Sequence, residues 1–148
     1  MSLNKMTAWS IAGLVAMALA APVLAQGDML SGADAIARRQ ELMTTIGGTM
    51  RSAGGATGDA RLAAAQTIVD SFAEVGMAFP EDSQEGDTKA LPAIWTDQGG
   101  FMQAYTTAVT AAADLLAAAE SGDEAAWGLA FKDLGAACGN CHTQYRAN

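Results

Sequence analysis

Apolar residues recur at helical spacing along most of the chain, and no stretch shows the strict alternation of a β-strand. Four helical segments can be delimited, at about residues 31–50, 59–75, 92–122 and 123 to nearly the end. Pro92 suits the first turn of the third segment, and Ser121 or Asp123 can cap the fourth. The acidic stretch 81–90 has no periodicity and predicts a long surface loop. The sequence therefore predicts an all-α fold, an antiparallel four-helix bundle.

The first 25 residues differ in character from the rest of the chain. Lys5 precedes an apolar run over residues 8–21, and small or short residues follow it up to Ala25. This layout is typical of a secretory signal peptide, and the run is shorter than the roughly 20 residues of a membrane-spanning helix. We expect residues 1–25 to be cleaved, residues 26–148 to form one domain, and the mature protein to lie in the periplasm without a membrane anchor.

The charge of the mature chain excludes one class of partner. Without Lys5 the chain keeps 7 basic and 16 acidic side chains, a formal net charge of −9. No basic patch is available to bind the phosphates of a nucleic acid. The acidity fits a solvated surface, and it also suits the docking of a positively charged redox partner.

Two cysteines and one histidine, the only ones in the chain, lie within five positions as Cys138, Cys141 and His142. On a helix these positions project toward one side. The C-x-x-C-H spacing is the attachment pattern of c-type haem. Two thioether bonds would hold the edge of the ring while the imidazole reaches the iron. We therefore predict one covalent haem c on Cys138 and Cys141, with His142 as an axial iron ligand.

Three other interpretations of these residues explain less. A disulfide is permitted in an oxidising compartment, but it gives the adjacent histidine no role. A thioredoxin-like dithiol needs a cysteine of low pKa at a helix N-terminus, whereas this pair lies near the C-terminal end of a predicted helix. A structural zinc site needs four ligands, and the chain offers three of Cys and His type.

The position of the motif limits the second axial ligand. Only six residues follow His142, so a sixth ligand cannot come from downstream and must come from another helix. It cannot be histidine, because the chain has no other.

The chain resembles the class II cytochromes c, the cytochrome c′ group with its low-spin c556 relatives. The resemblance covers essentially the whole mature chain. It rests on the C-terminal CGNCH run with Tyr145 and Arg146 after it, on Arg39 to Met43 followed by Gly47 and Gly48, and on Pro92 to Trp95. It implies a haem c held between four helices.

The resemblance also implies roles for individual residues. The position of Arg39 contacts a haem propionate in similar proteins, and Arg146 matches an arginine beside the proximal face of the haem. Met43 occupies the position over the open iron face, where cytochromes c′ have an apolar residue and c556-type relatives have a methionine ligand. Methionine suits both roles. Further candidates for the distal side are Met50, Phe72, Met77 and Phe79, whereas Trp95 and Trp127 are expected to pack between helices or at a subunit interface.

The function implied by the resemblance is that of a cytochrome c′-like protein that binds nitric oxide or carbon monoxide. The alternative is a c556-like electron carrier in which Met43 is the sixth iron ligand. A peroxidase or reductase is less favoured, because the chain has no second histidine and no obvious distal acid-base residue; we expect no enzymatic activity. Similar proteins often form homodimers through their first two helices, and the same is expected here.

Overall fold

The computed structural model describes residues 30–148, so the predicted signal peptide lies outside the described residues. Its elements are the helices α1 (Gly32–Ala53), α2 (Asp59–Val75), α3 (Ala93–Thr96), α4 (Gln98–Ser121) and α5 (Glu124–Tyr145), with a 3-10 turn η1 (Glu81–Ser83). The predicted all-α, four-helix bundle is confirmed. Over this part of the chain, none of the helices combines the length and the hydropathy that crossing a membrane requires.

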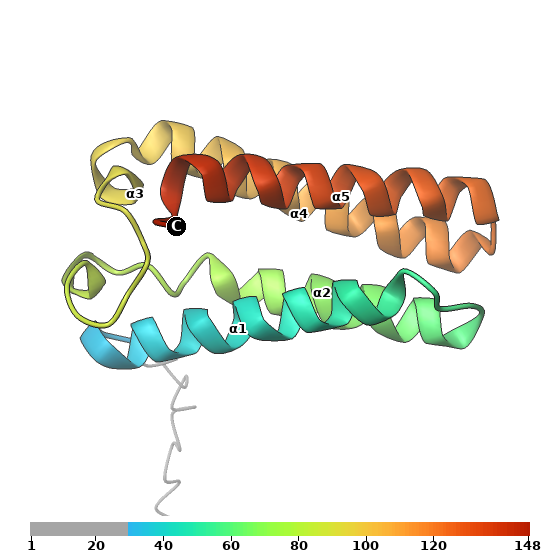
Figure 1. The fold of residues 1–148 in the computed structure, drawn as a ribbon, viewed down its shortest axis with the longest axis horizontal. Coiled ribbons are helices and arrows are strands. Elements are labelled where there is room, and N and C mark those ends of the chain that lie inside the picture. The colour runs from blue at the N-terminus through green and yellow to red at the C-terminus, as the bar shows by residue number, and fades with distance from the viewer. Residues whose placement is uncertain (1–29) are drawn as a thin grey trace, which may run out of the picture.

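The four long helices form two antiparallel hairpins that lie along each other (Figure 1). Helix α1 packs on α2, α2 on α4, and α4 on α5. Helices α1 and α5 do not pack closely on each other, so one of the four sides of the bundle is more open than the others. The short helix α3 and the C-terminus lie at the same end of the bundle (Figure 1).

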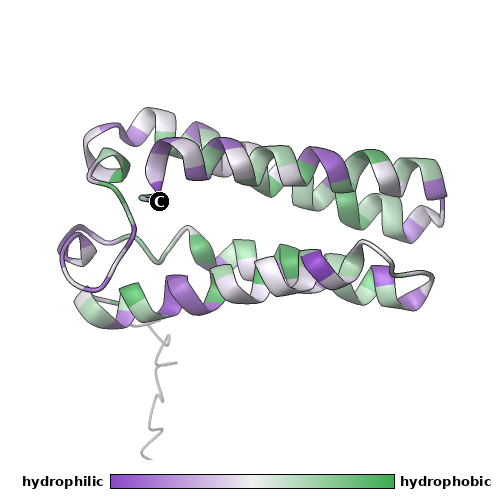
Figure 2. Cartoon of the chain, viewed as in Figure 1, coloured by the Kyte–Doolittle hydropathy of each residue, from purple (hydrophilic) through white to green (hydrophobic). Residues whose placement is uncertain are grey.

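The core is built from one apolar stripe on each long helix. Ile68, Leu115 and Leu134 are fully buried, and burying each such side chain contributes about 1.5–3 kcal/mol. Small buried side chains on α4, such as Ala108 and Ala112, let neighbouring helices approach closely. The long helices carry both apolar and polar segments along their length (Figure 2), as expected of helices that bury one face.

The third predicted helix is in fact two helices, α3 and α4, separated at Asp97. The backbone of Asp97 leaves the helical region at φ −121° and ψ 58°, and the Asp97 carboxylate accepts a hydrogen bond from the Gly100 amide at 3.1 Å. An aspartate that caps the following helix competes with continuous helical hydrogen bonding. The prediction of a single helix over 92–122 was wrong because it ignored this cap. The first helix, by contrast, runs past Gly47 and Gly48 to Ala53.

The stretch 81–90 is more ordered than a plain surface loop. Ser83 is fully buried within it, and Ala90 forms an antiparallel bridge with Arg146 beyond the end of α5. The Leu91 amide also donates to the Tyr145 carbonyl at 3.0 Å. This loop therefore ties the C-terminal end of α5 to the rest of the fold.

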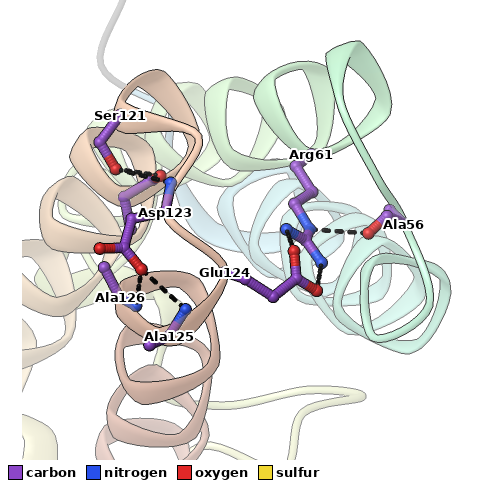
Figure 3. A network of polar contacts seen from close by, with 8 residues as sticks. Ala56, Arg61, Ser121, Asp123, Glu124, Ala125 and Ala126 are labelled. Atoms are coloured by element: carbon purple, nitrogen blue, oxygen red, sulfur yellow. Dashed lines mark hydrogen bonds and ion pairs between the residues drawn. The ribbon is translucent and has the colours of Figure 1, made fainter.

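The opposite end of the bundle is closed by an arginine that joins α2 to α5 (Figure 3). Arg61 donates to both carboxylate oxygens of Glu124 at 2.6 Å and to the Ala56 carbonyl at 2.7 Å. Its guanidinium lies 5.1 Å from the ring centroid of Trp127. Of the two predicted caps, Ser121 and Asp123, the second caps α5, since its carboxylate accepts from the amides of the first turn at 2.8 and 3.0 Å. Trp127 packs between helices in the core, which is one of the two expected placements.

Candidate functional site

A hollow lies between α1 and α5, and residues of α2 and α4 also line it. Its empty volume is about 850 Å³ when the space at its open mouth is included. It occupies the side of the bundle where α1 and α5 do not pack closely. The lining is mostly apolar and comes from all four long helices and Phe79; the residues are Met43, Ile46, Gly47, Met50, Phe72, Val75, Phe79, Phe101, Tyr105, Ala108, Gly135, Cys138, Cys141 and His142.

One wall of the hollow consists of the C-terminal part of α5. Cys138, Cys141 and His142 all line it, so the structure brings together the three residues that the sequence singled out. The two cysteines are half-buried and free. Burial raises the pKa of both thiols, and for Cys141 the nearby Cys138 adds to this effect. A reactive dithiol has a lowered pKa, so these cysteines do not fit a thioredoxin-like role.

The electrostatics of His142 favour its neutral form. Partial burial lowers the pKa of His142, and the positive charge of Arg146 lowers it further. A neutral imidazole has a free nitrogen lone pair and is the form that binds metal. The two thiols and this imidazole thus present two sulfur atoms and one nitrogen donor to the same apolar space.

The facing wall belongs to α1. Met43, Ile46, Gly47 and Met50 line it at successive helical spacings. Of the further candidates for this region, Phe72 and Phe79 also line the hollow. Met77 does not line it, because it lies in the turn after the end of α2 and is 64% exposed.

Arg39 lies outside the lining of the hollow, in contacts that hold the 81–90 loop on α1. Its side chain is buried, with 4% exposed. Its terminal nitrogens donate to the Ala78 carbonyl at 3.2 Å, to the Ser83 hydroxyl and carbonyl at 2.9 and 2.8 Å, and to the Thr88 hydroxyl at 2.7 Å. Its guanidinium also lies 5.1 Å from the ring centroid of Phe79.

All these partners of Arg39 are neutral. Within residues 30–148, no carboxylate lies at ion-pair distance from its guanidinium, and burial lowers its pKa. Four of the five N–H donors of an arginine can be assigned to the four bonds above, and Nε–H is left without a protein acceptor. A buried cation without an anionic partner is costly, so this site suits an additional anionic group.

Arg146 and Trp95 take up positions next to the site. The Arg146 amide donates to the His142 carbonyl at 3.2 Å, which closes the last turn of α5. The Trp95 indole nitrogen donates to the carbonyls of Phe79 and Pro80 at 3.2 Å. Trp95 therefore packs α3 against the segment that follows α2, in agreement with the expected packing role.

Several lining residues were not identified as such from the sequence. Phe101, Tyr105 and Ala108 lie at helical spacing, a signal that does not separate a lining residue from a core residue. Gly135 precedes Cys138 by three residues, so helical spacing alone places it on the same face, and that signal could have identified it. Val75 gave no signal that distinguishes a lining residue from a core residue.

The residues of the hollow fit a haem c group. The donor set consists of two thiols and one imidazole at C-x-x-C-H spacing, which matches two thioether links and one axial ligand. The remaining lining is apolar apart from the Tyr105 hydroxyl, which donates to the Phe72 carbonyl at 2.8 Å. An apolar macrocycle would cover this surface and bury it from water.

Comparisons with known proteins agree with the site. Cytochrome c-554 of Cereibacter sphaeroides is 46% identical over 71 residues, a match that spans 46% of each protein. Cytochrome c-556 of Agrobacterium tumefaciens is 33% identical over 75% of this chain and 95% of its own length. Cytochrome c′ of Rhodopseudomonas palustris is 32% identical over 97% of both chains.

The fold is also that of solved structures. A nitric oxide complex of a cytochrome c prime variant from Alcaligenes xylosoxidans superposes with a TM-score of 0.73 at 29% identity, over 82% of this chain and 100% of the other. A family model described as Cytochrome C′ matches residues 34–146. The chain therefore belongs to the cytochrome c′ family of class II cytochromes c, with one haem c bound covalently through Cys138 and Cys141.

Proposed function

We propose that this protein is an exported cytochrome c′-like haem protein with His142 as the proximal iron ligand and a distal side open to small neutral gases. The observation that carries the proposal is the pair of facing walls. Cys138, Cys141 and His142 line the wall from α5, and apolar side chains line the wall from α1. When bound, the haem supplies an iron that changes oxidation state and accepts a ligand on its free side.

The apolar α1 wall favours uncharged ligands such as nitric oxide or carbon monoxide. Moving an anion into such a space without a hydrogen-bond partner is costly, whereas a small neutral molecule loses little hydration. Apart from the attachment motif, Tyr105 is the titratable side chain in the lining, and its hydroxyl is already bound to the Phe72 carbonyl. The nitric oxide complex of the cytochrome c prime variant described above supports this ligand class.

The same lining argues for gas binding or electron transfer rather than catalysis. General acid-base catalysis needs a side chain that reaches the reacting group and has a pKa near the working pH. The α1 wall provides none from Met43 to Met50 within the lining. We therefore propose that the protein is not an enzyme.

Two arginines are proposed to support the haem. Arg146 lowers the pKa of His142 and thus favours the neutral, metal-binding imidazole. Arg39 is a buried guanidinium with neutral protein partners, and its unassigned Nε–H donor suits a haem propionate. A guanidinium and a carboxylate are geometrically well matched.

A second function is favoured by one specific residue. Met43 presents a thioether to the hollow, and a thioether on the iron would give a six-coordinate, low-spin electron carrier with a raised potential. The match to cytochrome c-556 of Agrobacterium tumefaciens is consistent with this alternative.

The substitution Met43→Leu separates the two functions, and Met50→Leu is its matched control, because both methionines line the hollow from α1. If Met43 only packs, the visible absorption spectra of both variants stay close to that of the native protein. If Met43 is a ligand, Met43→Leu alone becomes high-spin. A high-spin native spectrum that Met43→Leu leaves unchanged would exclude the electron-carrier alternative.

We also propose cleavage after Ala25, a periplasmic location for residues 26–148, and a homodimer formed through α1 and α2. The intact mass of the protein from a periplasmic extract tests the cleavage and the location, and it should equal the mass of residues 26–148 plus that of one haem. Sedimentation equilibrium tests the dimer. A retained N-terminus or a monomer at high concentration would contradict the respective proposal.

A further inference from the structure

His142 lies in the last turn of α5, three residues before the helix ends at Tyr145. The last turn of a helix has carbonyl groups without intrahelical partners and opens more readily than the middle. The position of the imidazole therefore depends on whatever holds this turn. The helix ends without a left-handed residue, since Arg146 is extended at φ −131° and ψ 132°.

The contacts that hold the turn converge on Tyr145. Its side chain is 4% exposed, and its hydroxyl donates to Asp97 Oδ2 at 2.9 Å. The other oxygen of the same carboxylate, Oδ1, accepts from the Gly100 amide at 3.1 Å. A carboxylate held in this way at the N-terminus of α4 is a fixed acceptor, and a hydroxyl bound to a carboxylate makes one of the stronger hydrogen bonds.

The ring of Tyr145 also reaches the haem site. It packs edge to face on Phe101 with centroids 5.4 Å apart, and Phe101 lines the hollow. Cys141 belongs to the same apolar cluster as Tyr145. Tyr145 follows Cys141 by one helical turn, so the anchor is in contact with the residue that holds one edge of the haem.

The space around the bond leaves little freedom. A Cβ atom at Gly100 would clash with the Asp97 carboxylate and would lie 2.5 Å from the Tyr145 hydroxyl oxygen, so glycine leaves room for the bond between them. Two backbone bonds complete the anchor. The Leu91 amide donates to the Tyr145 carbonyl at 3.0 Å, and the Ala147 amide donates to the Lys89 carbonyl at 2.8 Å.

We propose that Tyr145, through its hydrogen bond to Asp97, is a positioning residue that fixes the orientation of the His142 imidazole on the iron. Removing the hydroxyl leaves the backbone bonds and the ring in place and removes the side-chain bond that holds the last turn of α5 to Asp97 at the start of α4. Groups that orient a metal ligand from outside the coordination sphere have measurable effects on the metal site. This inference rests on the proposed role of His142 as the proximal ligand.

Proton NMR of the ferric holoprotein tests the inference, because the spread of the haem methyl resonances depends on the plane of the axial imidazole in both spin states. We expect Tyr145→Phe to shift these resonances and to broaden them. Asp97→Asn keeps the Oδ1 acceptor for the Gly100 amide and puts an NH2 donor in place of Oδ2, so the Tyr145 hydroxyl can no longer donate there. It should therefore shift the same methyls in the same direction. The two substitutions combined should add little to either one alone.

Ser71→Ala is the control for the loss of a buried hydroxyl group away from the haem site. It also removes a buried hydroxyl, which donates to the Thr67 carbonyl at 2.7 Å on α2, and Ser71 does not line the hollow. Its methyl resonances should match those of the native protein. Unchanged resonances in folded Tyr145→Phe would overturn the inference, and if that variant does not fold, unchanged resonances in Asp97→Asn would do so.

The native spectrum keeps the two proposals apart. If His142 does not bind the iron, the native protein lacks the strongly shifted resonances of a coordinated imidazole, and the proposed function fails at that point. If those resonances are present and the variants leave the haem methyls unchanged, only the role of Tyr145 and Asp97 fails.

Discussion

Replacing Arg39 with methionine tests how the buried arginine stabilises the fold around the haem site. Methionine keeps most of the length and the apolar stem of the side chain and removes the guanidinium. The substitution breaks four hydrogen bonds to Ala78, Ser83 and Thr88. It also removes the stacking of the guanidinium on Phe79.

The expected loss of stability follows from these contacts. A hydrogen bond to a charged group contributes about 1.5–3 kcal/mol, but the buried cation costs desolvation free energy that methionine does not. Leaving a buried acceptor such as the Ser83 carbonyl without its donor costs about 1–3 kcal/mol. We therefore expect Arg39→Met to lower the free energy of unfolding by about 3 kcal/mol. Arg39→Lys should recover only part of this, since an ammonium group cannot reproduce the fork of the guanidinium.

Urea unfolding of the ferric holoprotein, followed by far-ultraviolet circular dichroism, measures this loss. The matched control is Arg38→Met on the same helix turn, where the arginine is partly exposed and pairs with the exposed carboxylates of Glu41 and Glu74 at the surface. Exposed ion pairs contribute little, so Arg38→Met should shift the midpoint much less than Arg39→Met. An Arg39→Met midpoint equal to that of the native protein would refute the reasoning.

Further substitutions test two other contacts. Gly100→Ala should cost about 1–3 kcal/mol of stability through overpacking against the Asp97 carboxylate and the Tyr145 hydroxyl. Gly99→Ala meets open space and should gain about 0.5–1 kcal/mol as a better helix former. Equal urea midpoints for the two variants would contradict this. The ion pair with Arg61 lowers the pKa of Glu124. The ion pair therefore stabilises the fold fully above the ordinary glutamate pKa of about 4.3, and this stabilisation is lost as the pH falls through the lower pKa of Glu124 in the folded protein. The difference in urea midpoint between the native protein and Glu124→Gln should therefore be largest at neutral pH and shrink below about pH 4. A difference that does not change with pH would contradict this role of the ion pair.

The sequence was sufficient for the helices and the attachment wall. Helical spacing delimited the first, second and last helices to within a few residues, because their apolar stripes pack on neighbours as amphipathic helices do. Cys138, Cys141 and His142 could be assigned to one surface because their spacing on a helix fixes their common side. These inferences are local, since each depends on residues close together in the chain.

The contacts that link distant segments were not predictable in the same way. The bonds from Arg39 to Ser83 and Thr88 join residues more than 40 positions apart, and nothing in the local pattern indicates them. The break at Asp97 depends on the same carboxylate that binds Tyr145. A stretch without periodicity was taken for a surface loop, yet its Ser83 is fully buried by contacts with α1.

The central claim is that the iron faces His142 on one side and is open toward Met43 on the other. The visible absorption spectrum of the reduced native protein, recorded before and after the addition of carbon monoxide, tests it most directly. We predict a broad, unsplit visible region that indicates a five-coordinate iron, and a shift of the Soret band when carbon monoxide is added. Sharp α and β bands that do not respond to carbon monoxide would contradict the claim and identify a six-coordinate electron carrier instead.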